Sequence, residues 1–437
     1  MNMHRETDSL RAAWDKVVRQ MRIARRLDGK MLLGAFEPAF RAEGFREKCP
    51  GAVEQILVAS LDELGDNVLL TPFLRELRRS APKARIVLVV KPFLRSVFEL
   101  CPYINELLTL QPGFGQDMLQ QGGRLIEFCE QHLWALRLDK CFLPQWGDDK
   151  TELRLLGYLS GARERIGYGD EAIKVYSEVL EDQSSCGELL TESAIAPAEC
   201  VHEAERRLQL LRCHGMEVNR VGAELWLGAA DWQAAANLIT PLRGREKVLA
   251  LGIGAGWPGR RYTVPLYLQA LRELVDENWG VVVLGGQKER EEGDFLTGQL
   301  PSGSTVNIAG QASLRETAAV IGLTDLYLGN ETGVMHMAAA LGKPTVDICM
   351  EPASRRWLLP EILSPSARFH PWQTDYICLR PAEPLPECAE AVWYGYCMHW
   401  EVQHCISQIE PRELVEAVRM LWAHKSQTGA AISHRTG

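Results

Sequence analysis

The stretch "QILVASLDELGDNVLLTPFLRELRRSAPKARIVLVVK", residues 55–91, decides the fold class. Residues 55–60 form a short apolar run, residues 61–66 have the composition of a turn, and residues 67–82 carry the apolar spacing of an amphipathic helix. A second apolar run follows at residues 84–91. Two buried strands joined through a helix by short turns predict a parallel sheet with a right-handed crossover.

The same alternation returns in the second half of the chain. Strands are expected at 247–252, 280–286, 304–310, 324–330 and 345–350, and helices at 264–278 and 313–323. The two series predict two Rossmann-like domains facing a central cleft, at residues 51–225 and 240–425, with residues 224–247 as the passage between them. Ligands of such sheets bind beyond the carboxyl ends of the strands.

Residues 1–50 precede this pattern as an N-terminal helical extension. The stretch 8–36 has helical apolar spacing, with arginines on its other faces. A packed helix with a solvated basic face explains this pattern. Attachment of the helix to a membrane surface is the alternative that stays open.

Bulk composition limits the class of protein. The chain has 437 residues and a formal net charge of −9, which argues against a general nucleic-acid footprint. No apolar run approaches the roughly 20 residues of a membrane span, and "MNMHRETDSL" lacks the apolar core of a signal peptide, so a cytoplasmic location is expected.

The stretch "LGNETGVMHMAAALGKPTV", residues 328–346, crowds polar groups around the start of a helix. A helix over 333–341 is expected, with Thr332 as N-cap, Gly342 just past its end, and His336 pointing away from the main core contact. Free N–H groups at such a helix start bind anions, and Gly333 lets a phosphate approach closely. A capped core helix with a satisfied histidine is the equal alternative.

The turn "LGIGAGWPGRRYTV", residues 251–264, shifts this balance toward an anion site. Gly254, Ala255 and Gly256 expose backbone amides, and Arg260 supplies a bidentate donor suited to a diphosphate. Its glycine spacing is not the GxGxxG fingerprint of dinucleotide-binding domains. Glu289, after the next strand, either accepts hydrogen bonds from ribose hydroxyls or is a solvated glutamate at a helix start.

Asp62 and Asp66 follow the first strand of the first domain. Asp66 is expected to cap the following helix, and a carboxylate at this place could also take a proton from an acceptor hydroxyl. The two roles are compatible, and a single aspartate does not separate them.

Together, "ILVASLDELGDNVLLTPFLRELRRSAPKARIVLVV" (56–90) and "GNETGVMHMAAALGKPTV" (329–346) resemble glycosyltransferase family 9, the bacterial ADP-heptose heptosyltransferases of lipopolysaccharide assembly. The similarity covers roughly residues 53–425. It implies an α/β GT-B fold and an inverting, metal-independent sugar transfer. The donor, ADP-heptose by resemblance, would bind the second domain, and a glycan or glycolipid acceptor the first. No cofactor, metal or nucleic acid is implied, and a peripheral contact with the inner membrane stays open.

The resemblance also assigns roles to single residues. Asp66 matches the general base of the family's GD motif, and Arg260 falls where the family has a lysine against the donor diphosphate. The family's diphosphate-binding run, D/E-S/T-G-x-x-H, is matched by Glu331, Thr332, Gly333 and His336, with Glu331 in place of the commoner aspartate. Glu289 lies near the family's ribose contact. A transferase using a UDP-sugar, an epimerase and a non-catalytic nucleotide-sugar-binding relative are the alternatives.

Four cysteines gather near the C-terminus: Cys378, Cys388, Cys397 and Cys405. Their spacings are long and contain no C-x-x-C pair, so reduced structural thiols are expected rather than a metal site.

Overall fold

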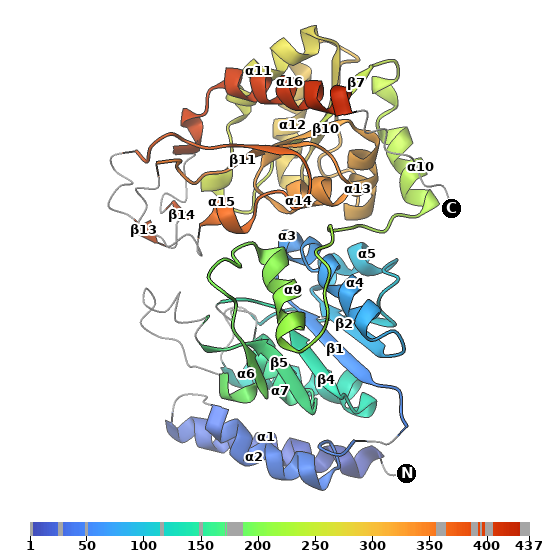
Figure 1. The fold of residues 1–437 in the computed structure, drawn as a ribbon, viewed down its shortest axis with the longest axis vertical. Helices are drawn as coiled ribbons and strands as arrows, with labels where there is room; N and C mark the ends of the chain where they lie inside the picture. Colours follow the sequence, from blue (N-terminus) through green and yellow to red (C-terminus); the bar gives the residue numbers. More distant parts are fainter. Residues whose placement is uncertain are drawn as a thin grey trace. The chain divides into compact units, whose positions relative to one another are not determined.

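The computed structural model describes residues 3–24, 29–48, 51–113, 118–147, 152–170, 172, 187–354, 364–385, 392–393, 396–397 and 405–428. The chain divides into two compact units, coloured along the sequence in Figure 1. The first unit comprises Met1–Glu63 and Pro72–Arg220, and the second comprises Leu64–Thr71 and Val221–Gly437. Residues 64–71 therefore belong to the second unit, although their neighbours in the sequence belong to the first.

The first unit is built on a parallel six-stranded sheet in the order β3-β2-β1-β4-β5-β6. Its strands are β1 (Gln55–Ser60), β2 (Arg85–Val90), β3 (Glu106–Thr109), β4 (Lys140–Leu143), β5 (Glu164–Tyr168) and β6 (Glu192–Ala194). This is the strand order of the Rossmann fold. The parallel pairing of the first two strands, predicted from residues 55–91, is confirmed by the register Ile56↔Ile86.

The connection between these two strands differs from the single helix predicted at 67–82. It consists of a short helix α3 (Leu64–Val68) and a separate helix α4 (Thr71–Ser80). The Thr71 hydroxyl donates a hydrogen bond to the Val68 carbonyl at 2.8 Å where the chain turns between them. The prediction that Asp66 caps the helix is wrong, because Asp66 lies in the first turn of α3, which begins at Leu64.

The N-terminal extension forms two helices, α1 (Met3–Ala24) and α2 (Gly29–Ala42), where one had been predicted. They pack side by side (Figure 1). Leu10 and Val17 of α1 and Phe36 and Phe40 of α2 are buried in one core with Leu57 of the sheet. The interpretation as a packed element is therefore confirmed for the described part of the extension.

The other helices of the first unit are α5 (Arg95–Phe98), α6 (Met118–Phe128), α7 (Leu153–Leu159) and α9 (Glu203–Cys213). Helices α6 and α7 share the core of the extension. Helix α4 covers the opposite face of the sheet, where the rings of Phe73 and Phe142 pack edge to face with centroids 5.7 Å apart.

Phe40 gives a test of this packing. Its side chain is fully buried, and its ring centroid lies 5.7 Å from that of Tyr158 and 5.3 Å from that of Phe45. Phe40→Ala should lower the free energy of unfolding by about 3–5 kcal/mol, because it removes a buried ring and leaves a cavity. Urea unfolding measures this, with Phe93→Ala as the control, since Phe93 is 49% exposed. Equal effects of the two substitutions would mean that α2 is not part of the core.

The second unit repeats the topology of the first, with the strand order β12-β11-β10-β7-β8-β9. Its strands are β7 (Lys247–Gly252), β8 (Trp279–Leu284), β9 (Thr305–Asn307), β10 (Leu326–Asn330), β11 (Thr345–Ile348) and β12 (Tyr376–Leu379). All of the pairs are parallel. A separate antiparallel pair is formed by β13 (Val392–Trp393) and β14 (Tyr396–Cys397).

Helices cover both faces of this second sheet. They are α10 (Ala229–Leu238), α11 (Val264–Asp276), α12 (Arg290–Gly298), α13 (Leu314–Leu323), α14 (Gly333–Ala340), α15 (Pro365–Arg368) and α16 (Pro411–Thr428). Helices α11 and α16 pack together on one face (Figure 1). Helices α10, α13 and α14 share a core on the other face, which also takes in Val68 of α3. Residues 224–247, predicted as a passage between domains, instead hold α10, which packs within the second unit.

No helix within the described part of the chain has both the length and the apolar character required to cross a membrane.

Candidate active site

The predicted site residues of the second unit converge where its strand order reverses. Strands β7 and β10 are neighbours, with Gly252 paired to Gly329, so the segments that follow these residues leave the sheet side by side. In open α/β sheets this switch point is the place where ligands bind. The glycine turn after β7 and the polar run after β10 are therefore parts of one site.

Asn330 joins these two segments. Its side chain is fully buried, and its amide Nδ2 donates hydrogen bonds to the carbonyls of Ile253 and Gly254 at 3.2 and 3.1 Å. Its Oδ1 accepts from the Tyr262 backbone N–H at 2.9 Å. One asparagine thus fixes the start and the end of the turn that carries Arg260.

The turn itself presents backbone donors. Gly254 and Ala255 are half-buried and Gly256 is exposed. No described residue accepts a hydrogen bond from the N–H groups of these three residues. Three successive small residues with available N–H groups are suited to bind an anion.

Arg260 ends the short 3₁₀ turn Pro258–Arg260 and reaches back to the other segment. Its Nη1 lies 3.5 Å from Oε1 of Glu331, which is 4% exposed. Burial raises the pKa of Glu331, the Arg260 charge lowers it, and the negative charge of Asp66 raises it further. The neighbouring Arg261 forms an ion pair with Glu292 of α12.

Helix α14 begins at Gly333 with Thr332 as its N-cap, and Gly342 follows its end with a φ of 67°, as predicted. The Thr332 side chain makes no capping hydrogen bond. The first N–H groups of the helix therefore have no acceptor within the helix or in this cap. His336, predicted to point away from the main core contact, is 3% exposed, because α3 packs over it.

The packing of α3 on α14 depends on two glycines. A Cβ atom at Gly65 would lie 2.7 Å from Cδ2 of His336, and a Cβ at Gly333 would lie 2.7 Å from Cβ of Leu64. The two helix starts therefore approach more closely than any other residue would allow. Asp66, in the first turn of α3, is held beside the site in this way, and its charge acts on Glu331.

Asp62, the other carboxylate considered, has a different environment in the first unit. Its Oδ1 accepts a hydrogen bond from Nε2 of Gln145 at 2.8 Å, and its Oδ2 lies 3.6 Å from Nη2 of the buried Arg207. Arg207 is also paired with Glu203 of α9 at 3.3 Å. Asp62 therefore belongs to a structural charge network.

Glu289 lies beside the glycine turn, since a Cβ at Gly254 would be 3.2 Å from its carboxyl carbon. Its Oε2 accepts a hydrogen bond from the Gly286 N–H at 2.9 Å, closing the turn before α12. The structure thus gives Glu289 the helix-start role, and a contact with ribose stays a prediction.

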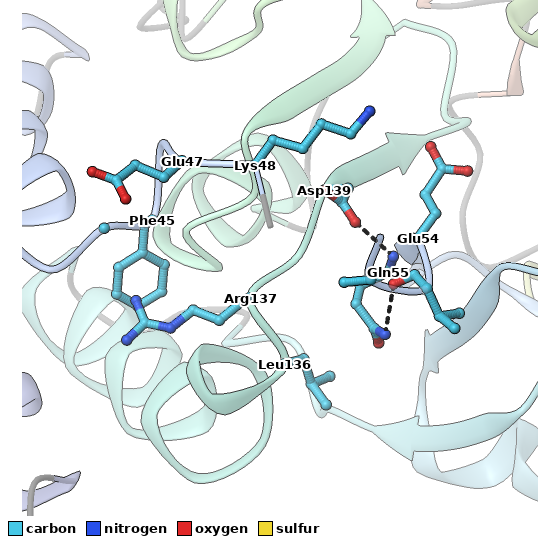
Figure 2. Close-up of a pocket in the computed structure, with 11 residues that line it drawn as sticks. Phe45, Glu47, Lys48, Glu54, Gln55, Leu136, Arg137 and Asp139 are labelled. Carbon is cyan, nitrogen blue, oxygen red and sulfur yellow. Dashed lines mark hydrogen bonds between the residues drawn. The ribbon is translucent and has the colours of Figure 1, made fainter. Parts of the chain in front are cut away.

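A cavity of about 660 Å³ lies in the first unit, and none of these residues lines it (Figure 2). It is lined in part by Gln55 and Asp139, at the amino ends of β1 and β4. Its charged groups serve the fold, since Oδ2 of Asp139 accepts from the Gln55 N–H at 2.8 Å and Arg137 stacks on Phe45. The carboxyl ends of the strands, where ligands of this fold bind, are at the other edge.

The C-terminal cysteines are only partly described. Cys405 is buried and Cys378 half-buried, and both are free thiols. Cys388 lies outside the described residues, and of Cys397 only the place of its backbone in β14 is described. Among the residues that the structure describes, no group of three or more histidine, cysteine, aspartate or glutamate side chains is arranged to hold a metal ion. The predicted absence of a metal stays a prediction.

Two Rossmann-like units in one chain, with anion-suited groups at the switch point of the second, are the architecture of the GT-B fold. A family model described as glycosyltransferase family 9 (heptosyltransferase) matches residues 179–357. Lipopolysaccharide heptosyltransferase 2 of Salmonella typhimurium is 24% identical over 300 residues, which cover 67% of this chain and 81% of that protein. The Escherichia coli protein of the same name is 23% identical over the same shares of the two chains.

Solved structures show the same fold. A family 9 glycosyltransferase from Veillonella parvula matches with a TM-score of 0.67 at 18% identity, over 86% of this chain and 100% of that chain. The ADP-heptose lipopolysaccharide heptosyltransferase II of Escherichia coli matches with a TM-score of 0.64 at 19% identity, over 85% and 99%. The chain is thus similar to glycosyltransferase family 9 over residues 179–357, and the GT-B fold predicted from its sequence is confirmed.

Proposed function

We propose that this glycosyltransferase transfers heptose from ADP-heptose to a saccharide acceptor in the assembly of lipopolysaccharide or a related glycan. The relatives named lipopolysaccharide heptosyltransferase 2 support the sugar and the pathway. The observation that carries the chemistry is the packing of α3 on α14, because it brings the Asp66 carboxylate to the start of an anion-binding helix.

In this proposal the second unit binds the donor and the first unit binds the acceptor. The N–H groups of the turn 254–256, the guanidinium of Arg260 and the start of α14 at Thr332 and Gly333 hold the diphosphate. His336, in the first turn of the same helix, adds a further hydrogen-bond donor. Glu289, beside Gly254, is placed to accept from the ribose hydroxyls of the donor.

The transfer itself is a single displacement that inverts the anomeric carbon. Asp66 takes the proton of the acceptor hydroxyl while the hydroxyl oxygen attacks the sugar on the face opposite the diphosphate. The bond between the anomeric carbon and the diphosphate oxygen breaks, and ADP leaves with the electron pair. Arg260 and the backbone donors stabilise the charge that grows on the diphosphate.

The proposed acceptor also suggests where the enzyme works. The enzyme would bind a lipid-linked glycan acceptor in the cytoplasm, at the inner face of the membrane. The exposed face of α1, with Lys16, Arg19 and Arg22, suits contact with an anionic surface. Sedimentation with vesicles of anionic lipid, compared with neutral vesicles, tests this placement.

The function is tested by a donor screen. The purified enzyme is incubated with a heptose-free lipopolysaccharide core acceptor and, one at a time, with ADP- and UDP-sugars. The masses of the products are measured by mass spectrometry. We expect a mass increase of one heptose with ADP-heptose and much less product with the UDP-sugars. Preferential transfer from a UDP-sugar would contradict the donor assignment.

Arg260→Ala locates the donor site in the same system. It should weaken ADP-heptose binding at least about tenfold, because a charge-assisted hydrogen bond contributes about 1.5–3 kcal/mol. Arg272→Ala is the matched control, since Arg272 is exposed on α11. Calorimetry that finds the same affinity in both variants would show that the diphosphate binds elsewhere.

A further inference from the structure

An aspartate stands in the middle of a buried parallel strand next to the site. Asp347 of β11 is fully buried, paired in register with Gly329 of β10 on one side and with Cys378 of β12 on the other. Such strands are normally apolar on both faces. Within the described part of the chain, neither carboxyl oxygen of Asp347 has a hydrogen-bond partner of ordinary geometry, and the Cys378 thiol opposite it is a weak donor.

Glu331 is the second buried carboxyl of this cluster. Its Oε1 is paired with Arg260 at 3.5 Å, and its Oε2 has no hydrogen-bond partner among the described residues. The charged groups that act on it, besides Asp347, are Arg260, Asp66, Arg368 and Glu351. Glu351 is engaged elsewhere, since its Oε2 accepts from the Ser364 hydroxyl at 2.7 Å and lies 3.5 Å from Arg380.

Glu331 and Asp347 thus compete for the positive charge of Arg260. Burial and the charge of Glu331 raise the pKa of Asp347 well above its usual range. The other titratable groups that act on Asp347 or feel its charge are Cys378, Tyr267, Tyr327 and Tyr376. None of these is a cation. The positive charges that lower the pKa of Glu331 are those of Arg260 and Arg368, and Arg260 is the one that forms an ion pair with it, at 3.5 Å.

We propose that the donor's diphosphate replaces Glu331 as the partner of Arg260, and that Glu331 takes up one proton from solvent in the same step. The inference depends on the proposed function, because it takes Arg260 as a diphosphate ligand. Once Arg260 turns to the phosphates, a charged Glu331 would be buried without its ion-pair partner, beside Asp66 and the new negative charge. An uncompensated buried charge is costly, so the carboxyl becomes neutral.

The proposal predicts that the affinity for the donor depends on pH and falls as the pH rises. The complex binds one proton more than the free enzyme, so donor affinity is highest below the free-state pKa of Glu331. It falls as the pH rises through the interval between the free and bound pKa values, by up to about tenfold per pH unit. Above the bound pKa the affinity levels off.

Calorimetry of ADP-heptose binding to the full chain tests this between pH 6 and 8. The heat is measured in buffers of different ionisation enthalpy, phosphate and Tris, which gives the number of protons taken up. The sugar-linked diphosphate does not titrate in this range, so the protons come from the protein. We expect an uptake of up to about one proton in the wild-type enzyme and its loss in Glu331→Gln, whose affinity becomes independent of pH.

Asp347→Asn is the matched control, because it makes the same change of carboxyl to amide in the same cluster. It should keep the uptake, since the ion pair that the diphosphate would displace is made by Glu331 and not by Asp347. His336→Gln should also keep it, and this variant serves if Glu331→Gln does not fold. Binding without proton uptake in the wild-type enzyme, uptake that survives Glu331→Gln, or its loss in His336→Gln would overturn the inference. Absence of ADP-heptose binding in the wild-type enzyme would overturn the proposed function as well.

Discussion

Asp66→Asn should bind ADP-heptose almost as tightly as the wild-type enzyme and turn it over at least about 100-fold more slowly. A sugar hydroxyl has a pKa far above 7, so its attack needs a base as the bond forms, and a placed base contributes about 10²–10⁴-fold in rate. Asparagine keeps the shape of the side chain in the first turn of α3 and loses the proton acceptor. The effect should therefore appear in kcat, with the donor Kd nearly unchanged.

Asp62→Asn supplies the control for this experiment. The substitution is the same, four residues earlier, but Asp62 is held by Gln145 and Arg207. We expect Asp62→Asn to lower stability, because it weakens the pairing of a buried arginine, and to change turnover much less. Turnover and thermal unfolding are measured on both variants. Near-normal turnover of folded Asp66→Asn protein would remove Asp66 as the base.

Much of the fold follows from local pattern. The runs at 55–60 and 247–252 have unbroken apolar residues at 56–59 and 248–251, and both are strands, as predicted; the structure places both at the centre of their sheets. The break between α3 and α4 was missed because residues 67–82 keep helical apolar spacing through it. The turn at Thr71 is fixed by a side chain that bonds both to the Val68 carbonyl and to the backbone N–H of Glu224, far along the chain.

The sequence predicted which segments form the candidate site, but it did not predict which side chains contact one another there. The sequence indicated that the turn after 252 and the run after 330 follow strands, and the strand order makes them neighbours. The role of Asn330 was missed, although a polar residue ending a buried strand beside glycine turns was a usable signal. Asp347 was missed because "TVDICM" was interpreted only as a strand. Nothing local indicates that residues 64–71 pack in the second unit, since this depends on glycines 268 positions apart.

Gly65→Ala should lower turnover by at least about tenfold and reduce the stability of the second unit. The added Cβ would lie 2.7 Å from Cδ2 of His336, which is buried beneath α3. Either the histidine ring or α3 must move, and overpacking of this kind costs about 1–3 kcal/mol. A displacement of about 1 Å at a catalytic group can cost about 100-fold in rate, so a shift of Asp66 with α3 is expected to dominate.

Gly298→Ala is the matched control for this substitution. Gly298 ends α12 in the same unit, and an added Cβ there meets no atom within 4 Å. It should leave turnover unchanged and the free energy of unfolding equal or higher by up to about 1 kcal/mol, because alanine favours a helix over glycine. Turnover and urea unfolding are measured for both variants. If Gly65→Ala retained wild-type turnover and stability, the close packing of α3 on α14 would not be what positions Asp66.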